Sequence, residues 1–271
     1  MKIFKSRYKL QKKISNNSNI SFVPTMGGLH EGHISLIKRA KKIKGNCLVS
    51  IFVNPKQFNN IKDFKRYHRD IKKDLRILTA LKVDYLYIPS YEDVFLFRPK
   101  CSIFVNKFSK KLCGKFRKGH FEGVLDVINR FLEIIKPKSL LLGEKDYQQL
   151  YLIHSHIKKR KIKTKVIPSK SIRNKNGVVF STRNKNIDNK QLKIASRVYH
   201  YLKNKKLIIN KNFLLFNRSM IKKDLLNIGL EKIEYIELLN IKTMKKLKHN
   251  NEKFKIFIAY YLGGTRFIDN I

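Results

Sequence analysis

The sequence predicts an α/β fold, in which a Rossmann-like parallel sheet with helices on both faces precedes a smaller C-terminal α+β domain. Two observations carry this prediction. Up to residue 167, short apolar runs alternate with segments of helical periodicity, which is typical of a mostly parallel sheet. Beyond about Pro168, helices are followed by strand-like runs instead. We therefore expect two domains, residues 1–169 and 170–271.

Within the first domain, the runs expected to form strands cover residues 20–23, 47–53, 84–88, 140–142 and 165–167. Between them, helical spacing of apolar residues predicts helices from His30 onward and over residues 70–81, 121–135 and 147–157. The helix at 70–81 should place on one face Ile71, Leu75, Leu78 and Leu81. The helix at 121–135 is apolar on nearly every side and should be deeply buried. The last helix repeats Leu150, Ile153, His154 and Ile157.

The second domain is expected to begin with a turn around Asn176-Gly177, within residues 171–179. Helices should follow at 191–202 and 220–226, and strands at 233–239 and 253–262. Gly263-Gly264 is typical of a tight hairpin leading into a last strand at 265–268.

Composition restricts the class of protein. The 271 residues include 61 Lys and Arg against 19 Asp and Glu, giving a net charge of +42. Such a charge could serve a nucleic acid. The basic residues form no single tail or stripe, however, so we expect no dedicated nucleic-acid partner. An odd number of scattered cysteines argues against a disulfide scaffold or a zinc site. Without a secretory signal or an apolar span of membrane length, we expect a cytoplasmic protein that does not contact a membrane.

The segment at residues 22–33 carries the strongest indication of chemistry. An apolar run leads through Gly27-Gly28 to His30 and His33, at the start of an amphipathic stretch. The three-residue spacing places both imidazoles on one face of the first helical turn. We expect backbone N–H groups and the two imidazoles to surround a phosphate there. No third ligand has the spacing of a zinc site.

Four further polar segments follow predicted strands or open predicted helices. They are 143–149, with Lys145 as a mobile charge, 181–184, with two hydroxyls beside Arg183, 54–58, with two amides around Pro55, and 116–124, with Arg117 and His120 open to an anion. Each, taken alone, is also compatible with an ordinary polar turn.

Together these segments resemble the pantothenate synthetase family of the His-x-Gly-His nucleotidyltransferase superfamily. The match covers most of the chain and is strongest from Val23 to Asn184. It comprises Pro-Thr-Met-Gly-x-Leu-His-x-Gly-His, Phe-Val-Asn-Pro-x-Gln-Phe, Gly-His-Phe-x-Gly-Val, Gly-Glu-Lys-Asp-x-Gln-Gln and Ser-x-Arg-Asn. Three positions depart from the family pattern, namely Thr182 in place of Ser, and Lys118 and His68 in place of Pro.

The resemblance implies a role for each matched position. Catalytic roles would fall to His33, His30, Lys145 and Arg183. Pantoate would be held by Gln57 and Gln149. ATP would be bound by Met26, Gly27, Gly28, Leu29, His30, Glu31, Gly32, His33, Gly143, Glu144, Lys145, Asp146, Ile172, Phe180, Ser181, Thr182 and Arg183. The smaller domain would act as a lid.

The resemblance also implies a reaction. ATP, with Mg²⁺, would activate pantoate as pantoyl adenylate, and β-alanine would then displace AMP to give pantothenate. The family suggests a homodimer, and it names no metal ligands in this chain. Two alternatives stay open at this stage. Another nucleotidyltransferase or a reduced class I aminoacyl-tRNA synthetase also opens a helix with paired histidines, and a nucleic-acid-binding module would account for the charge.

Overall fold

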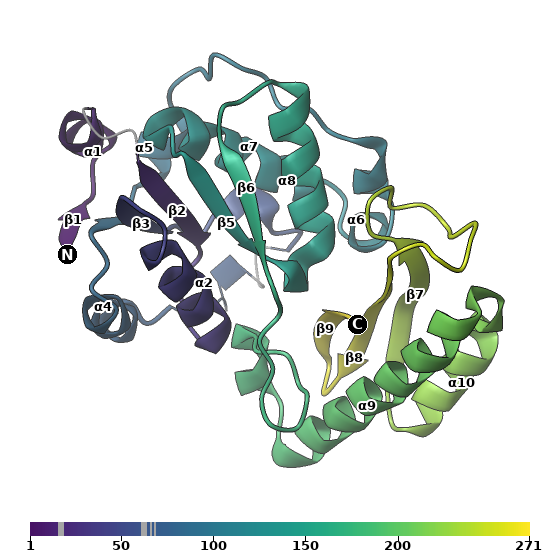
Figure 1. The fold of residues 1–271 in the computed structure, drawn as a ribbon. Coiled ribbons are helices and arrows are strands. Elements are labelled where there is room, and N and C mark those ends of the chain that lie inside the picture. The colour runs from purple at the N-terminus through teal and green to yellow at the C-terminus, as the bar shows by residue number, and fades with distance from the viewer. Residues whose placement is uncertain (16–18, 61–63, 66, 68) are drawn as a thin grey trace. The chain divides into compact units, whose positions relative to one another are not determined.

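The computed structural model describes residues 1–15, 19–60, 64, 65, 67 and 69–271 (Figure 1). His68, one of the departures from the family pattern, lies outside the described residues. The chain forms two compact units, Met1–Lys170 and Ser171–Ile271. Among the described residues, no helix is both long and apolar enough to cross a membrane.

Unit 1 is built on a six-stranded sheet in which every pair of neighbours is parallel. The strands, in chain order, are β1 (Lys2–Phe4), β2 (Ile20–Thr25), β3 (Asn46–Ile51), β4 (Tyr85–Tyr87), β5 (Ser139–Gly143) and β6 (Lys165–Ser169). Their spatial order is β1-β4-β3-β2-β5-β6. The chain runs outward from β2 in one direction to β3 and β4, and later in the other direction to β5 and β6. The sheet therefore has its topological switch point between β2 and β5, where ligands of such folds bind.

Helices cover both faces of this sheet (Figure 1). One face carries α2 (Glu31–Lys41) and α4 (Ile71–Ala80), and the other carries α1 (Arg7–Ile14), α5 (Tyr91–Phe95), α7 (His120–Ile135) and α8 (Tyr147–Lys159). A further short helix is α6 (Cys113–Phe116). Alternation along β2 fills both layers, because Val23 packs with Ile37 and Leu78 while Phe22 meets the ring of Phe131 edge-on.

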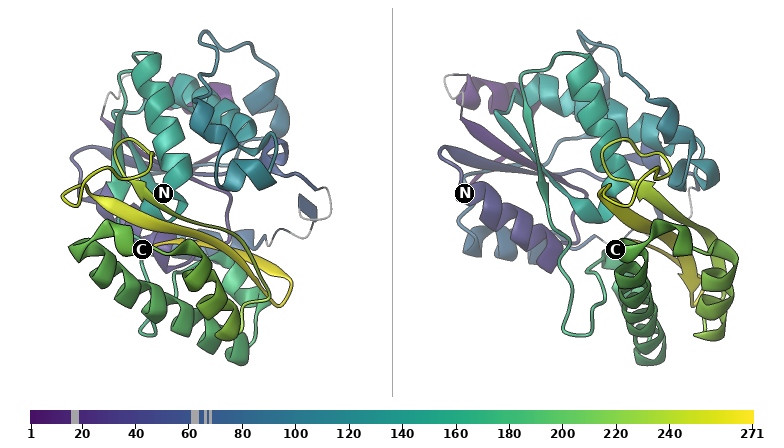
Figure 2. Two further views of the ribbon diagram at one scale, coloured as in Figure 1. Left: turned by 90° about the vertical axis from the view of Figure 1, so that its right-hand side faces the viewer. Right: turned by 45° about the vertical axis from the view of Figure 1, so that its right-hand side comes forward.

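Unit 2 is a three-stranded antiparallel sheet of β7 (Lys232–Asn240), β8 (Phe254–Leu262) and β9 (Thr265–Asn270). Two helices, α9 (Asn189–Lys211) and α10 (Arg218–Asn227), lie on one face of it (Figure 2). Gly263 and Gly264 join β8 to β9 with φ values of 55° and 63°, which a two-residue hairpin of this twist requires. Arg173 anchors the start of the unit, because its guanidinium donates to both oxygens of Asp269 at 2.7 Å.

The predicted fold class is confirmed, and each predicted strand and helix is present with shifted ends. The largest shift is in α9, which runs to Lys211 rather than to residue 202. The sequence analysis did not predict β1, α1, α5 or α6. Two residues assigned to apolar helix faces are exposed, Ile71 on α4 and His154 on α8, whereas His156 on α8 is buried.

Candidate active site

The predicted site segments of unit 1 meet at the carboxyl edge of the sheet, around the switch point. The turn 26–30 follows β2, and a 3₁₀ turn at Glu144–Asp146 follows β5, the neighbour of β2. A second 3₁₀ turn, η1 (Pro55–Gln57), lies just beyond β3, the other neighbour. Parallel strands end at the same edge, so three segments far apart in the sequence are brought together there.

The backbone amides of the turn after β2 are bonded within the protein. Gly27 N–H donates to Thr25 Oγ1 at 3.2 Å. Gly28 and Leu29 each donate to a carboxylate oxygen of Asp74, on α4, at 2.8 Å. The expectation that these amides would surround a phosphate together with the imidazoles is therefore wrong for these three groups. The Asp74 carboxylate already occupies the position that an anion would take beside the Gly28 and Leu29 amides.

The two histidines cap α2 reciprocally. Nδ1 of His30 accepts from Gly32 N–H at 3.1 Å, and Nδ1 of His33 accepts from His30 N–H at 3.4 Å. A ring nitrogen that accepts cannot carry a proton, so each neutral ring bears its proton on Nε2. The ring centroids are 4.1 Å apart. The helix start thus presents two Nε2–H donors side by side, as the spacing of the motif predicts.

Both imidazoles are neutral at physiological pH. Burial lowers the pKa of His30 to about 4 and that of His33 to about 3, with Lys145 contributing to both shifts. The donors are therefore uncharged, and the positive charge of the site comes from Lys145 and from the positive end of α2. Neutral donors suit a reaction in which negative charge moves between phosphate oxygens without a proton transfer to the enzyme.

Lys145 and Asp146 follow β5, the neighbour of β2, and both act electrostatically on each ring, Lys145 lowering the pKa and Asp146 raising it. The Lys145 ammonium donates to the Asp146 carboxylate at 3.2 Å. The ammonium is largely buried, whereas the carboxylate is about half-exposed at 47%. One cation and one anion thus stand beside two neutral donors at the switch point.

Gln57, predicted to bind pantoate, lies next to this turn. Its Nε2 donates to the sulfur of Met26 at 2.8 Å, and its Oε1 accepts from Asn54 Nδ2 at 3.1 Å. Met26 belongs to the predicted ATP segment, so the structure brings residues predicted for the two substrates into contact. A thioether is a weak acceptor, which leaves the Gln57 amide ready to exchange it for a stronger one.

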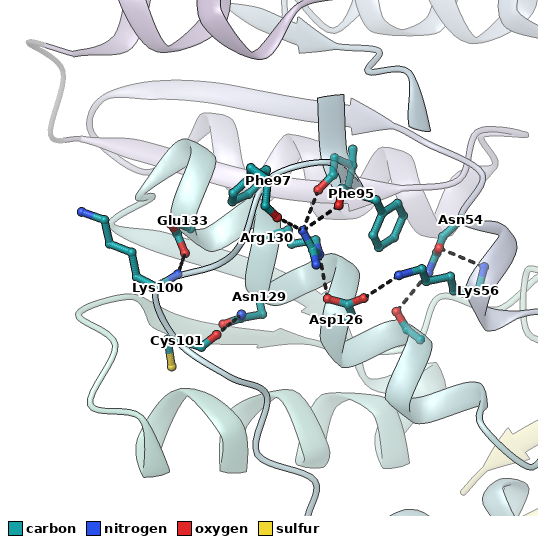
Figure 3. Close-up of polar contacts among 12 residues, drawn as sticks. Asn54, Lys56, Phe95, Phe97, Lys100, Cys101, Asp126, Asn129, Arg130 and Glu133 are labelled. Atoms are coloured by element: carbon teal, nitrogen blue, oxygen red, sulfur yellow. Dashed lines mark hydrogen bonds and ion pairs between the residues drawn. The ribbon is translucent and has the colours of Figure 1, made fainter. Parts of the chain in front are cut away.

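Side-chain contacts with helix α7 hold η1 and the preceding Asn54 in place (Figure 3). Asn54 Nδ2 donates to Gly123 O at 3.0 Å, and Lys56 pairs with Asp126 at 3.1 Å. Asp126 also pairs with Arg130, whose guanidinium donates to backbone carbonyls of residues 94, 95 and 97. One face of α7 therefore fixes both η1 and the end of α5 with the residues that follow it.

Arg117 and His120 do not stand open to an anion as the sequence analysis expected. Both bond to the backbone carbonyl of Gln57, Arg117 at 3.2 Å and His120 at 2.7 Å, and they also bond to each other at 3.1 Å. Arginine is always a donor, so His120 accepts at Nε2 and donates from Nδ1. Their role in this structure is to hold the Gln57 backbone.

The two glutamines at the start of α8 have different environments. Gln148 is buried and bonds to the backbone of Phe108, Lys111 and Cys113. Gln149, the predicted pantoate residue, is partly exposed in the first turn of the helix. Successive helix residues point about 100° apart, so Gln149 is directed away from the segment that Gln148 holds.

In unit 2, the predicted ATP residues gather on one short hairpin and the turn after it. Phe180 N–H donates to Ile172 O at 3.1 Å. Ser181 begins the 3₁₀ turn η4 (Thr182–Asn186) and its hydroxyl accepts from Arg183 N–H at 3.3 Å. Among the described residues, no carboxylate pairs with the Arg183 guanidinium.

The described residues contain no cluster of three or more His, Cys, Asp and Glu that could hold a metal ion. All three cysteines are free. Asp74 is the site residue that sequence reasoning missed. The signal was an acidic residue among the apolar positions of the helix at 70–81, on the side of Leu78, where a solvated carboxylate would not be expected.

Known proteins share this architecture along the whole chain. A family model described as Pantoate-beta-alanine ligase matches residues 2–271. A pantothenate synthetase from Fervidobacterium nodosum is 38% identical over 267 residues, which are 96% of this chain and 94% of the relative. One from Francisella tularensis subsp. mediasiatica is 39% identical over 272 residues, or 98% and 94%.

Solved structures of the same family show a similar fold over the whole chain. A pantoate-beta-alanine ligase from Francisella tularensis, complexed with beta-gamma ATP and beta-alanine, has a TM-score of 0.83 and 37% identity, covering 100% of this chain and 97% of its own. A pantothenate synthetase from Thermus thermophilus has a TM-score of 0.86 and 26% identity, covering 100% and 99%.

Proposed function

Because the chain belongs to the pantoate–β-alanine ligase family, we propose the following residue roles for an enzyme that condenses pantoate with β-alanine at the expense of ATP. The reaction passes through pantoyl adenylate and releases AMP and pyrophosphate. The observation that carries the residue roles is the pair of neutral imidazoles beside Lys145 at the switch point of the parallel sheet.

In the first step, a pantoate carboxylate oxygen attacks the α-phosphorus of ATP, and the bond from that phosphorus to the oxygen bridging to the β-phosphate breaks. His30 and His33 donate from Nε2 to the phosphate oxygens on which charge develops, and Lys145 adds a positive charge. Gln57 and Gln149 hold pantoate, with Gln57 exchanging the Met26 sulfur for a substrate oxygen. Positioning and charge stabilisation account for the rate, since no covalent enzyme intermediate is needed.

Unit 2 contributes Ser181, Thr182 and Arg183 to the triphosphate end in this proposal, and Ile172 and Phe180 to the adenine. Arg183 follows two hydroxyl residues in the sequence, and no carboxylate pairs with its guanidinium among the described residues, which supports the proposal because arginine binds phosphate through two parallel hydrogen bonds. Acting as a lid, the unit would exclude water from the mixed anhydride. In the second step the neutral amine of β-alanine attacks the acyl carbon, AMP leaves with the electrons of the C–O bond, and the amine loses a proton.

We also infer that Mg²⁺ accompanies ATP. The donor set fits, because Mg²⁺ is usually held by substrate phosphates, water and one or two carboxylates, and Asp146 offers a half-exposed carboxylate near the imidazoles. The ion would neutralise part of the phosphate charge. A homodimer in the cytoplasm completes the proposal, and sedimentation equilibrium tests the oligomeric state.

The function is tested by product analysis with ATP, pantoate and β-alanine, omitting each in turn. We expect pantothenate and AMP only with all three, and exchange between ATP and pyrophosphate that depends on pantoate. Exchange that depends on a different acid, or on an amino acid, would identify another adenylating enzyme and overturn the proposal.

The role of the histidines is tested by His33→Ala. Removing a donor aimed at developing charge costs roughly 3–4 kcal/mol, so turnover should fall at least about a hundredfold while the fold is kept. His200→Ala, at an exposed position in α9, serves as the matched control. Near-normal turnover in His33→Ala would remove the proposed role.

A further inference from the structure

Among the described residues near the candidate site, Asp74 is the most deeply buried acidic side chain, with 2% of its surface exposed. It lies on α4, 45 and 46 residues away in the sequence from the amides that it binds. Both carboxylate oxygens are used, one for Gly28 N–H and one for Leu29 N–H, each at 2.8 Å. Such short bonds to a charged acceptor are among the stronger ones in proteins.

The turn that Asp74 binds is one that only glycine adopts easily. Gly27 and Gly28 have φ values of 79° and 64°, in the left-handed region. A Cβ on Gly27 would lie 2.9 Å from Asp74 Oδ2 and 3.2 Å from Ile51 Cγ2, so a side chain there would displace the carboxylate. The two glycines and the aspartate therefore fit one another closely.

The turn is directly connected to the imidazoles. Leu29, whose amide is held, precedes His30, and His30 N–H in turn donates to the ring of His33. Any rotation of the peptide groups at residues 28 and 29 moves the start of α2 and both rings with it. The carboxylate also occupies the amides that would otherwise attract a phosphate to the turn.

We propose that Asp74 is a positioning residue of the ligase, whose carboxylate fixes the turn at 26–29. As a result, the Nε2–H groups of His30 and His33, and not the backbone amides of the turn, face the reacting phosphate. This inference rests on the proposed function for its kinetic consequence. Its structural part, the orientation of the two rings, can be measured without turnover.

The test is Asp74→Asn. Asparagine keeps the shape of the side chain but replaces one acceptor oxygen by an NH2 donor, so one of the two backbone N–H groups loses its acceptor. Asp84→Asn is the matched control. Asp84 accepts from Cys47 N–H, near the start of β3, at 2.8 Å and from Lys41 Nζ at 2.9 Å. Both variants remove a carboxylate that accepts from backbone N–H groups of unit 1, in the turn after β2 for Asp74 and in β3 for Asp84. Three quantities are measured: the melting temperature, kcat and KM for ATP and pantoate, and the imidazole ¹⁵N signals of histidine-labelled protein.

We expect kcat of Asp74→Asn to fall at least about tenfold, with KM values changed less than about threefold. The reason is that misplacing donors that act in the transition state lowers kcat more than it weakens substrate binding. The ¹⁵N signals of His30 and His33 should lose their single Nε2–H tautomer. Asp84→Asn should keep kcat within about twofold and both tautomers.

A kcat of Asp74→Asn within about twofold of wild type, or an equal loss in Asp84→Asn, would overturn the inference. If the unaltered enzyme shows no pantoate-dependent exchange, the proposed function fails, whereas the tautomer signals still decide the role of Asp74. Should Asp74→Asn not fold, Gly27→Ala disturbs the same contact from the other side, and unchanged kcat and ¹⁵N signals there would equally contradict the inference.

Discussion

Gly32 shows at the scale of one residue why the motif has glycine between its histidines. Its φ is not in the left-handed region, so backbone conformation does not demand glycine. Instead, a Cβ there would lie 2.9 Å from Cε1 and 3.1 Å from Nδ1 of His30. The glycine therefore makes room for the ring that caps the helix.

Gly32→Ala should consequently lower kcat about tenfold or more, because the His30 ring must turn away from its cap. Stability should change by no more than about 1 kcal/mol in either direction, because the higher helix propensity of alanine offsets the loss of the His30 cap. Steady-state kinetics and thermal unfolding, with exposed Lys38→Ala in the same helix as control, measure both. Full activity in Gly32→Ala would mean that the ring position is unimportant.

The sequence predicted the histidine pair because its spacing is local, set by the helical turn. It could not predict Asp74, which meets the turn only through the packing of α4 beside α2. Nor could it predict that Arg117 and His120 turn inward to a carbonyl. Whether a polar side chain meets a ligand or the backbone depends here on contacts with segments distant in the sequence, 60 and 63 residues away for these two.

At the scale of elements, α7 and η1 meet at Gly123 with no room for a side chain. A Cβ on Gly123 would lie 2.3 Å from Lys56 O and 2.9 Å from Gln57 N, both backbone atoms. Because backbone cannot rotate aside as a side chain can, η1 would have to move as a whole.

Gly123→Ala should therefore raise KM for pantoate at least about tenfold, and more than KM for ATP, because it displaces Gln57. Val127→Ala, in the next turn of the same helix, removes buried methyl groups at a cost of about 1–3 kcal/mol without touching η1. This control separates lost stability from lost substrate binding. Equal changes in both KM values would argue against a specific role of η1 in holding pantoate.

Element prediction succeeded where the periodicity was long. Helix α7, with apolar residues on nearly every side, was predicted to within one residue. Strand β1 has three residues, and α1 carries little apolar periodicity, so neither has enough pattern to be recognised alone. Both depend on partners distant in sequence, as β1 pairs with β4.

At the scale of the whole molecule, buried neutral histidines link stability to pH. Burial lowers the pKa of His30, His33 and His156, the last to about 4. His156 accepts from Phe104 N–H and donates to Asn129, a pair of bonds possible only for the neutral ring. As the pH falls below about 6.5, these histidines bind protons in the unfolded chain but not yet in the folded chain.

The free energy of unfolding should thus be insensitive to these groups above about pH 7 and should fall as the pH drops from 6.5 toward 4. Each histidine contributes at most about 1.4 kcal/mol per pH unit in that window. Denaturant unfolding at fixed ionic strength measures the slope. His156→Asn should flatten it, whereas His154→Asn, on the exposed side of α8, should not. A slope that is the same in both variants would contradict the assignment to His156.

The occupied amides after β2 bear on inhibitor chemistry. A compound that imitates a triphosphate for a glycine-rich loop relies on several main-chain donors, and here Gly27, Gly28 and Leu29 are already engaged by the protein. A selective blocker should instead offer uncharged acceptors opposite the imidazoles, and these need not carry the multiple negative charges that hinder entry into cells.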